Sequence, residues 1–243
     1  MICILGAGVA GLTLAQYLKK QGRKFIILER KDTTESGWEG YSLTLMQAVD
    51  ILKELELFDN LTDTIPTTRS LGYASDGTPL WNRDSWANKT IVRRSELLRV
   101  LSSGIAITYF DYDRYVSYED YIMVYDKSGT SIRCNYLVGC DGLRSKVRLQ
   151  LLGENYIETC HNLTLITGIT PSEDINNSSI QYVDGVSRLF IKPYDCNNMM
   201  WQLSFPSYLS DSNLTDIQNA STIISTWCVE IRLLIANSTN VSQ

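Results

Sequence analysis

The sequence has few residues of the kinds that bind metal ions. It contains one histidine, His161, and its six cysteines include no Cys-x-x-Cys pair. Structural zinc sites need about four closely spaced cysteine or histidine ligands, and disulfide scaffolds need cysteines at framework spacings. We therefore expect no metal site and no disulfides, and we interpret the cysteines as reduced, mostly buried thiols of a cytoplasmic protein.

Long apolar runs are absent as well. No stretch of eighteen apolar residues occurs, because Glu230 and Arg232 interrupt the apolar segment near the C-terminus. A membrane-spanning helix needs about 20 such residues. The apolar stretch at the N-terminus lacks the preceding positive charge of an export signal, since the first charged residue is Lys19. We therefore expect no integral membrane segment and a cytoplasmic location.

Basic residues are in the minority. The 243 residues include 22 Lys and Arg against 27 Asp and Glu, which gives a net charge of −5 and a pI near 5.0. No basic cluster is available to offset a phosphate backbone, so we expect no nucleic-acid partner. The apolar fraction of 44% is ordinary for a globular chain, and the length suits one large domain or two small ones.

The sequence does contain a glycine-rich turn near its N-terminus. Residues 2–5 form a short apolar run, three glycines follow, and apolar residues then recur at helical spacing up to Gly22. Residues 24–30 have the continuous apolar character of a buried parallel strand. The first thirty residues therefore predict one strand–helix–strand unit.

This unit has the features of a dinucleotide site. In a Gly-x-Gly-x-x-Gly turn the glycines allow a sharp bend and a close approach of a diphosphate to the helix N-terminus. Glu29 lies eighteen positions after Gly11, where an acid accepts hydrogen bonds from ribose hydroxyls and argues against a 2′-phosphate. The cofactor contacts predicted here are Gly6, Ala7, Gly8, Val9, Ala10, Gly11, Glu29 and Arg30.

The rest of the chain alternates between helical and strand patterns. Further helices are predicted at residues 45–58 and 94–103, and short strands split by turns at residues 105–139 indicate a β-meander. After about residue 159 the pattern changes to strands, followed by one helix-like segment that ends at Ile235. A plain NAD-dependent dehydrogenase is one hypothesis for such a chain, but the meander argues against its regular strand–helix repeats.

A second motif is the Asp-Gly-x-x-Ser-x-x-Arg pattern of Asp141, Gly142, Ser145 and Arg148, which follows a strand and opens a helix. Together with the glycine turn it resembles the flavoprotein aromatic hydroxylases, FAD-dependent monooxygenases that share the p-hydroxybenzoate hydroxylase fold. The resemblance implies an α/β FAD/NAD(P)-binding three-layer fold of parallel sheet, helices and β-meander, with an interleaved β-sheet substrate domain. It also implies that Asp141 and Gly142 lie beside the diphosphate.

Other segments extend this resemblance over most of the chain. The stretch "VRRSELLRVL" is similar to a helix start that contacts the flavin, which would make Arg94 a cofactor contact. Residues 70–90 are polar, aromatic and turn-rich, with a hairpin signal at Asp76-Gly77, and we interpret them as an excursion from the core domain. We expect residues 1–70 and 91–158 to form the FAD-binding domain. Residues 71–90 and 159–243 would form part of the substrate domain.

The implied activity is hydroxylation of an aromatic or polycyclic small molecule with FAD, NAD(P)H and O2. No catalytic acid or base can be named from the sequence. His161 lies in a predicted loop and is interpreted as solvated or hydrogen-bonded. Arg93 is either a solvated neighbour of Arg94 or a phosphate contact, and we favour the first interpretation. A non-enzymatic binding protein similar to the GDP-dissociation inhibitors is the alternative, but that resemblance stops at the first motif and leaves Asp141 to Arg148 unexplained.

The sequence departs from the family pattern in two places. Glu56 stands where relatives usually carry a helix-ending glycine. The third family motif, a Gly-Asp pair that binds the ribityl and phosphate part of FAD, is absent before Gln243. Losing such a contact removes about 1.5–3 kcal/mol, so we expect FAD affinity at least about tenfold lower. Three interpretations therefore remain open. The sequence is a fragment of a longer protein, a truncated product of doubtful activity, or a chain that a partner chain completes.

Overall fold

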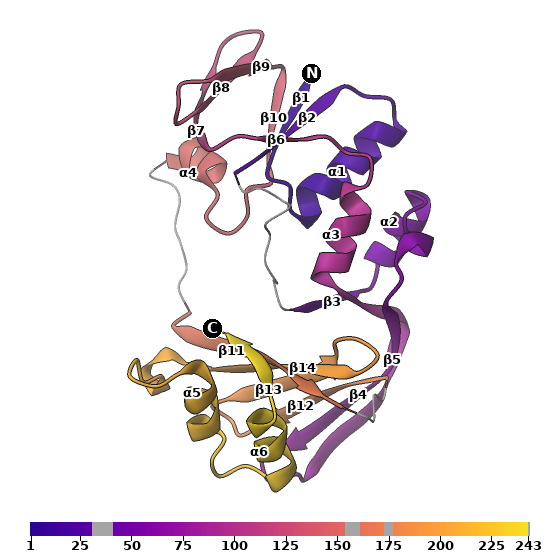
Figure 1. Cartoon of the computed structure of the whole chain (residues 1–243), viewed down its shortest axis with the longest axis vertical. Helices are drawn as coiled ribbons and strands as arrows, with labels where there is room; N and C mark the ends of the chain where they lie inside the picture. Colours follow the sequence, from indigo (N-terminus) through magenta and orange to yellow (C-terminus); the bar gives the residue numbers. More distant parts are fainter. Residues whose placement is uncertain (31–40, 154–160, 173–176, 243) are drawn as a thin grey trace. The chain divides into compact units, whose positions relative to one another are not determined.

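The computed structural model describes residues 1–30, 41–153, 161–172 and 177–242, without the side chains of 85–88 and 240. The chain divides into two compact units (Figure 1). The first unit comprises Met1–Glu39, Leu52–Asn60 and Leu97–Thr159, and the second comprises Gly40–Ile51, Leu61–Glu96 and Cys160–Gln243. Compared with the predicted domain boundaries, this division places residues 40–51, 61–70 and 91–96 in the second unit.

A parallel sheet forms the centre of the first unit. Its strand order is β10 (Tyr136–Gly139), β1 (Ile2–Leu5), β2 (Phe25–Glu29) and β6 (Ile107–Tyr109). Each neighbouring pair is parallel. Cys3, Ile4 and Leu5 are buried, as expected for a strand covered on both faces. The carboxyl ends of β1, β2 and β10 therefore meet at one edge of the sheet.

Helices cover one face of this sheet. They are α1 (Val9–Lys20) and α3 (Arg94–Ser102), with α2 (Ala48–Glu54) beside them (Figure 1). The buried side-chain amide of Gln16 on α1 donates hydrogen bonds to the carbonyl oxygens of Leu101 and Ser103 at the end of α3. One polar side chain thus joins two helices without leaving its own donors unsatisfied.

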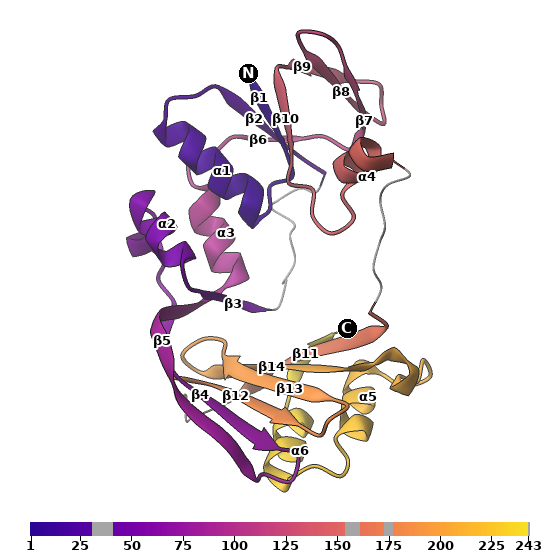
Figure 2. The same ribbon diagram turned by 180° about the vertical axis from the view of Figure 1, so that it is seen from behind.

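The other face of the sheet carries the β-meander (Figure 2). Strands β7 (Tyr112–Ser117), β8 (Ile122–Asp126) and β9 (Ser131–Cys134) pair antiparallel. Their core merges with that of the parallel sheet through residues such as Cys3, Leu28, Val124 and Cys134. The short helix α4 (Lys146–Leu152) follows β10.

The second unit is built on an eight-stranded, mostly antiparallel sheet. The strand order is β15 (Thr239–Ser242), β11 (Leu163–Pro171), β14 (Asn198–Pro206), β13 (Arg188–Pro193), β12 (Ser178–Val183), β4 (Thr64–Ala74), β5 (Pro79–Arg93) and β3 (Ser42–Leu45). Helices α5 (Asp216–Ile223) and α6 (Val229–Ala236) pack on one face and enclose a core that includes Trp201, Phe205 and Trp227. The short 3-10 helices are η1 (Phe58–Asn60) and η3 (Ser207–Leu209).

The predicted three-layer fold with a second β-sheet unit is confirmed, but two local predictions were wrong. The helix predicted over 45–58 begins only at Ala48, because Leu45 pairs with Thr90 as part of β3. The hairpin signal at Asp76-Gly77 is confirmed, since residues 70–90 belong to the long β4–β5 hairpin. The last helix-like segment is two helices, α5 and α6.

Glu56 ends α2 in the conformation that a glycine usually adopts. Its φ is +59°. The Glu56 N–H bonds to the Lys53 carbonyl at 3.0 Å and the Leu57 N–H bonds to the Leu52 carbonyl at 2.9 Å. These two bonds define a Schellman motif with Glu56 at its left-handed position. The predicted departure from the family pattern therefore falls on a strained backbone position.

Candidate functional site

The three glycines of the first turn have three different structural roles. Gly6 has a φ of +106°, and a Cβ atom there would collide with the carbonyl oxygen of Cys140 at the end of β10. A Cβ atom on Gly11 would collide with the carbonyl oxygen of Gly6. Gly6 and Gly11 are therefore required for the close approach of β1, β10 and α1.

Gly8 differs from the other two glycines because it faces open space. A Cβ atom there would meet no heavy atom within 4 Å. Gly8 is the N-cap of α1, and no side chain caps the helix at this point. The first turn of α1 has no acidic residue, and Lys19 and Lys20 lie in its last turn. The N-terminal N–H groups and the positive end of the helix dipole thus favour an anion in the open space next to Gly8.

Glu29 at the end of β2 is held against the turn. Its Oε2 atom accepts a hydrogen bond of 2.7 Å from the Ala7 N–H. This bond fixes a carboxylate beside the open space next to Gly8, at the edge where parallel strands of such sheets bind their ligands. A carboxylate has about four lone-pair sites in all and can accept hydrogen bonds from several donors, including hydroxyl groups.

The Asp-Gly-x-x-Ser-x-x-Arg segment forms a loop that is stabilised by hydrogen bonds among its own residues. The Asp141 carboxylate accepts hydrogen bonds from the Ser145 hydroxyl at 2.6 Å and from the Val147 N–H at 3.2 Å. Ser145 caps α4 by accepting the Arg148 N–H at 3.0 Å, and the Arg148 guanidinium donates to the Leu143 carbonyl. The motif thus shapes the loop that follows β10, and both Asp141 oxygens take part in holding it.

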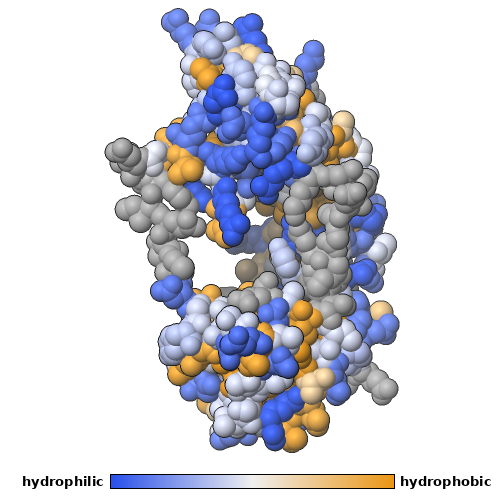
Figure 3. All heavy atoms as spheres, turned by 60° about the vertical axis from the view of Figure 1, so that its left-hand side comes forward, coloured by the Kyte–Doolittle hydropathy of each residue, from blue (hydrophilic) through white to orange (hydrophobic). Residues whose placement is uncertain are grey.

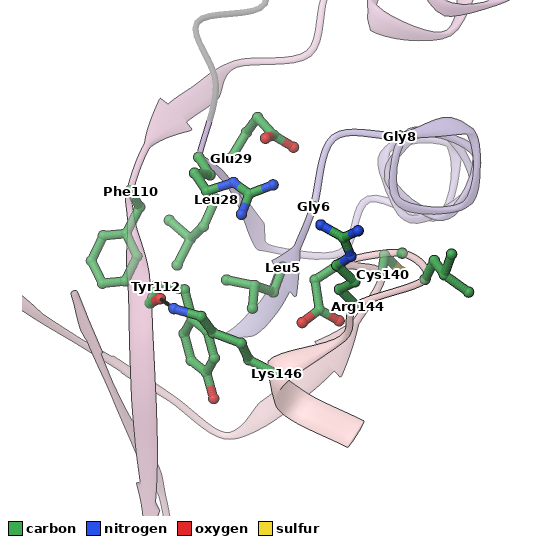
Figure 4. A pocket seen from close by; sticks show the side chains of 14 residues that line it. Leu5, Gly6, Gly8, Leu28, Glu29, Phe110, Tyr112, Cys140, Arg144 and Lys146 are labelled. Carbon is green, nitrogen blue, oxygen red and sulfur yellow. Dashed lines mark hydrogen bonds between the residues drawn. The ribbon is translucent and has the colours of Figure 1, made fainter. Parts of the chain in front are cut away.

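A cavity of about 480 Å³ lies at this edge of the first unit. In Figure 4, Glu29, Leu28 and Phe110 lie on one side of it and Cys140 and Arg144 on the other. Its lining residues are Leu5, Gly6, Gly8, Leu28, Glu29, Arg30, Phe110, Tyr112, Cys140, Asp141, Gly142, Leu143, Arg144 and Lys146. The volume is within the range of about 300–1,000 Å³ that is usual for small-molecule sites.

The charged residues of the cavity include three cations, Arg30, Arg144 and Lys146, against the carboxylates of Glu29 and Asp141. The Lys146 Nζ atom donates to the Tyr112 carbonyl at 2.8 Å, which fixes this ammonium at the wall. A cavity that combines an uncapped helix N-terminus with several cations is suited to a phosphate-containing ligand.

Aromatic side chains form one wall of the cavity. Phe110 and Tyr112 are buried, and the Tyr112 hydroxyl donates to the Gln150 side chain at 3.2 Å. Burial, with smaller effects of Tyr115 and Asp141, raises the pKa of Tyr112 well above its usual range. Burial and the neighbouring Asp141 also raise the pKa of the Cys140 thiol. Neither group therefore offers an anion for catalysis near neutral pH.

Six of the predicted cofactor contacts line the cavity: Gly6, Gly8, Glu29, Arg30, Asp141 and Gly142. Ala7 contributes its N–H to Glu29, and Val9, Ala10 and Gly11 form the first turn of α1. Arg94 belongs to the second unit and is not among the residues that line this cavity. Its N–H bonds to the Tyr41 carbonyl at 3.1 Å, and its guanidinium lies over the Tyr41 ring.

Phe110, Tyr112, Arg144 and Lys146 are among the eight lining residues that were not predicted from the sequence. Phe110 directly follows β6 and Tyr112 begins β7, so their place beyond the carboxyl end of a parallel strand was a usable signal. Arg144 and Lys146 lie inside the second motif. Arg93 is half-buried and forms an ion pair of 2.5 Å with Asp63, and it is not among the residues that line the cavity. His161 is exposed, as predicted.

The predictions on metals, thiols and membrane helices can be compared only with the described residues. There, no group of three or more potential metal ligands is found, and Cys3, Cys134, Cys140, Cys196 and Cys228 are free. Cys160 lies outside the described residues. Within the same part of the chain, no helix combines the length and apolarity needed to cross a bilayer. The visible face of the first unit is largely hydrophilic (Figure 3).

Comparison with known proteins identifies the family. The family model described as "FAD binding domain" matches residues 1–176, which include both motifs and the whole cavity. The chain belongs to this FAD-binding family. Its relatives are FAD-dependent monooxygenases, so the resemblance drawn from the two motifs is confirmed.

One such relative is the FAD-dependent monooxygenase dbaB of Emericella nidulans, which is 36% identical over 168 residues. The alignment covers 63% of this chain and 42% of that protein, so the chain spans less than half the length of this relative. The solved structure of Klebsiella pneumoniae HpxO with FAD and uric acid matches 100% of this chain and 67% of its own, with a TM-score of 0.84 and 18% identity.

A second solved structure, 2,6-dihydroxypyridine-3-hydroxylase from Arthrobacter nicotinovorans, gives the same TM-score of 0.84 at 16% identity. It covers 99% of this chain and 70% of its own. At these identities the two structures show the fold alone. They show that the chain has the order and pairing of helices and strands found in these two solved structures.

Proposed function

We propose that this chain binds the ADP part of FAD in the cavity of the first unit. We further propose that it is the FAD-binding part of a monooxygenase that hydroxylates an aromatic or polycyclic small molecule. NAD(P)H would be the electron donor, O2 the co-substrate and the cytoplasm the location. When bound, FAD supplies the redox chemistry and the activation of oxygen. The chain spans 42% of the relative dbaB, so catalysis is proposed for the whole protein.

One observation carries the cofactor proposal: the open space next to Gly8 lies in the same cavity as the Glu29 carboxylate. A diphosphate needs N–H donors and positive charge, which the start of α1 and the cations Arg144 and Lys146 offer. A ribose needs a hydrogen-bond acceptor, which Glu29 offers at the end of β2. The ADP group contains both parts, next to each other.

The residues of this chain would then have different roles in binding the cofactor. Gly8 leaves room for the diphosphate, and the Ala7 N–H holds Glu29 ready for the ribose hydroxyls. The buried Phe110 and Tyr112 would exclude water from one side of the ligand. Asp141 would act mainly by keeping the loop after β10 in shape, since Ser145 and Val147 already bond to its carboxylate.

One further contact remains a proposal. Arg94 would contact the flavin, and its pKa is lowered by burial. Support for a small ring-shaped substrate comes from the solved relatives named for uric acid and for 2,6-dihydroxypyridine.

Titration of the purified chain with FAD tests this proposal. Flavin fluorescence should change saturably, and ADP should compete, because the cavity is proposed to hold the ADP part. A Glu29→Gln variant should bind FAD more weakly than the wild type, while Glu119→Gln, an exposed site in the same unit, should not. A folded wild-type chain that shows no saturable response to FAD would refute cofactor binding.

A further inference from the structure

Gln150 on α4 joins that helix to the first strand of the β-meander. Its Oε1 atom accepts hydrogen bonds from the Tyr115 N–H at 3.0 Å and from the Tyr112 hydroxyl at 3.2 Å. Its Nε2 atom donates to the Tyr115 carbonyl oxygen at 2.6 Å. The Gln150 side chain is not among those that line the cavity of the first unit. Any effect of Gln150 on a ligand there must therefore pass through the residues that it holds.

Two of the three bonds cover a free strand edge. Strand β7 is an outer strand of its sheet, whose order is β7-β8-β9. The outward-facing main-chain groups of such an edge strand have no partner strand. The Gln150 amide binds both the N–H and the carbonyl oxygen of Tyr115, as a residue of a neighbouring strand would. Covering the edge explains these two bonds, but it does not require the third bond, to the Tyr112 hydroxyl.

Tyr112 lies where β7 is irregular. The register of β7 with β8 shifts between Tyr112 and Arg114, as in a β-bulge, and bulges redirect neighbouring side chains. The Tyr112 side chain is buried and lines the cavity. Helix α4 holds this residue at both ends, because Gln150 accepts its hydroxyl and Lys146 Nζ donates to its carbonyl oxygen at 2.8 Å (Figure 4).

Lys146 and Gln150 lie four positions apart and therefore share one face of α4. Both side chains bond to β7, and Lys146 also lines the cavity. No residue of α4 is buried, Leu149 and Leu151 are exposed, and Val147 packs partly buried against the core of the unit. Because apolar packing of α4 is sparse, the position of the Lys146 ammonium depends largely on the polar bonds between α4 and β7.

We propose that Gln150 is a positioning residue of the cofactor site, which holds Lys146 where its ammonium contacts the diphosphate of the ADP part. The inference rests on the proposed function, because it concerns the same cavity. Through the Tyr112 hydroxyl, Gln150 also fixes the aromatic wall beside this ammonium. The alternative, in which Gln150 only covers the edge of β7, predicts an effect on the free energy of unfolding and no effect that depends on Lys146.

Calorimetric titration of the full chain with ADP tests the inference in a double-mutant cycle. Gln150→Leu removes all three bonds, and it should weaken ADP binding about tenfold, because a contact between an ammonium and a phosphate contributes at least that factor. In a chain that already carries Lys146→Met, the same substitution should change ADP affinity by less than about twofold. Equal losses in the two backgrounds would overturn the inference, since Gln150 would then not act through Lys146.

Two further variants separate positioning from general destabilisation. Tyr112→Phe removes only the third bond and should weaken ADP binding by about two- to tenfold, but not in a chain that carries Gln150→Leu. Gln21→Leu replaces an exposed glutamine at the end of α1 in the same unit and should leave ADP affinity unchanged. If Gln150→Leu does not fold, Tyr112→Phe takes its place in the cycle with Lys146→Met, and equal losses there would overturn the inference.

Urea unfolding establishes that each titrated variant is folded. A folded Gln150→Leu chain with the ADP affinity of the wild type would refute this inference alone. A folded wild-type chain that does not bind ADP would refute the proposed cofactor site, and the inference with it.

Discussion

The main-chain N–H of Ala7 donates a hydrogen bond of 2.7 Å to the carboxylate of Glu29, 22 residues further along the chain. This bond joins the glycine turn after β1 to the end of β2. It orients an acid beside the open space at Gly8 before any ligand arrives. Preorganisation of this kind lowers the cost of ordering a site on binding.

The first prediction concerns this carboxylate. Glu29→Gln keeps the shape of the side chain but removes the charge that strengthens hydrogen bonds to ribose. Such charge-assisted bonds contribute about 1.5–3 kcal/mol, so FAD affinity should fall by roughly 10- to 100-fold. Flavin fluorescence titration measures the change, with Glu119→Gln as the control. An unchanged dissociation constant for Glu29→Gln would show that the carboxylate does not contact the cofactor.

Substitutions of the turn glycines should separate an effect on FAD affinity from an effect on the free energy of unfolding. Gly8→Ala places a methyl group in open space, so unfolding free energy should fall by less than about 1 kcal/mol while FAD binding weakens at least about tenfold. Gly11→Ala forces a methyl group against the Gly6 carbonyl and should cost about 2–3 kcal/mol of stability. Urea unfolding and FAD titration of both variants measure the two effects. A stable Gly11→Ala chain would contradict the packing role.

Glu56 offers a test of backbone strain that is independent of the cofactor. The left-handed φ of +59° costs a non-glycine residue about 1–2 kcal/mol, partly offset by the extra chain entropy that glycine loses on folding. Glu56→Gly should therefore stabilise the chain by about 0.5–1 kcal/mol in urea unfolding. Glu54→Gly, at the last residue of α2, should instead destabilise it by up to about 1 kcal/mol. Equal effects of the two substitutions would rule out strain at Glu56.

Lys192 should reduce the stability of the fold. Burial lowers its pKa from 10.5 to about 8. Lys192→Met removes this desolvation cost but also the bond to Ser42, so it should stabilise the chain at pH 7 by about 2 kcal/mol. The contacting groups, the Ser42 carbonyl, the Thr44 hydroxyl and the Phe190 ring, do not titrate.

The pH dependence has a definite sign. Below pH 8 both folded and unfolded states carry the Lys192 proton, and the penalty is fully present. Between pH 8 and 10.5 the unfolded state binds more protons, so stability of the wild type relative to Lys192→Met should rise with pH. Urea unfolding of both proteins at pH 7 and pH 9.5 measures this. A constant difference between them would show that the lysine is not desolvated.

The local part of the site could be predicted from the sequence, because its determinants are close together. The glycine turn, Glu29 and the strand–helix–strand unit depend on thirty consecutive residues. Asp141 was added through the resemblance of its motif to the flavoprotein hydroxylases, and it lines the same cavity because the carboxyl ends of parallel strands meet at one edge. The wall formed by Phe110 and Tyr112 was missed, since it depends on how the β-meander packs against the sheet.

The curvature of the eight-stranded sheet could not be predicted from the sequence patterns. The contact between Lys192 and Ser42 joins residues separated by 150 positions, and it exists only because the eight-stranded sheet curls β3 over β13. For the same reason the helix was predicted to begin at residue 45, whereas α2 begins at Ala48. Leu45 fits the helical spacing of its neighbours, but its pairing with Thr90 decides its conformation.

Hydrogen–deuterium exchange with and without FAD tests the central claim most directly, because it locates the bound cofactor along the chain. FAD should slow exchange in residues 6–12, at the start of α1, and in the loop at residues 140–146 after β10. Protection absent from both segments, with FAD shown to be bound, would contradict the placement of the ADP group at the glycine turn.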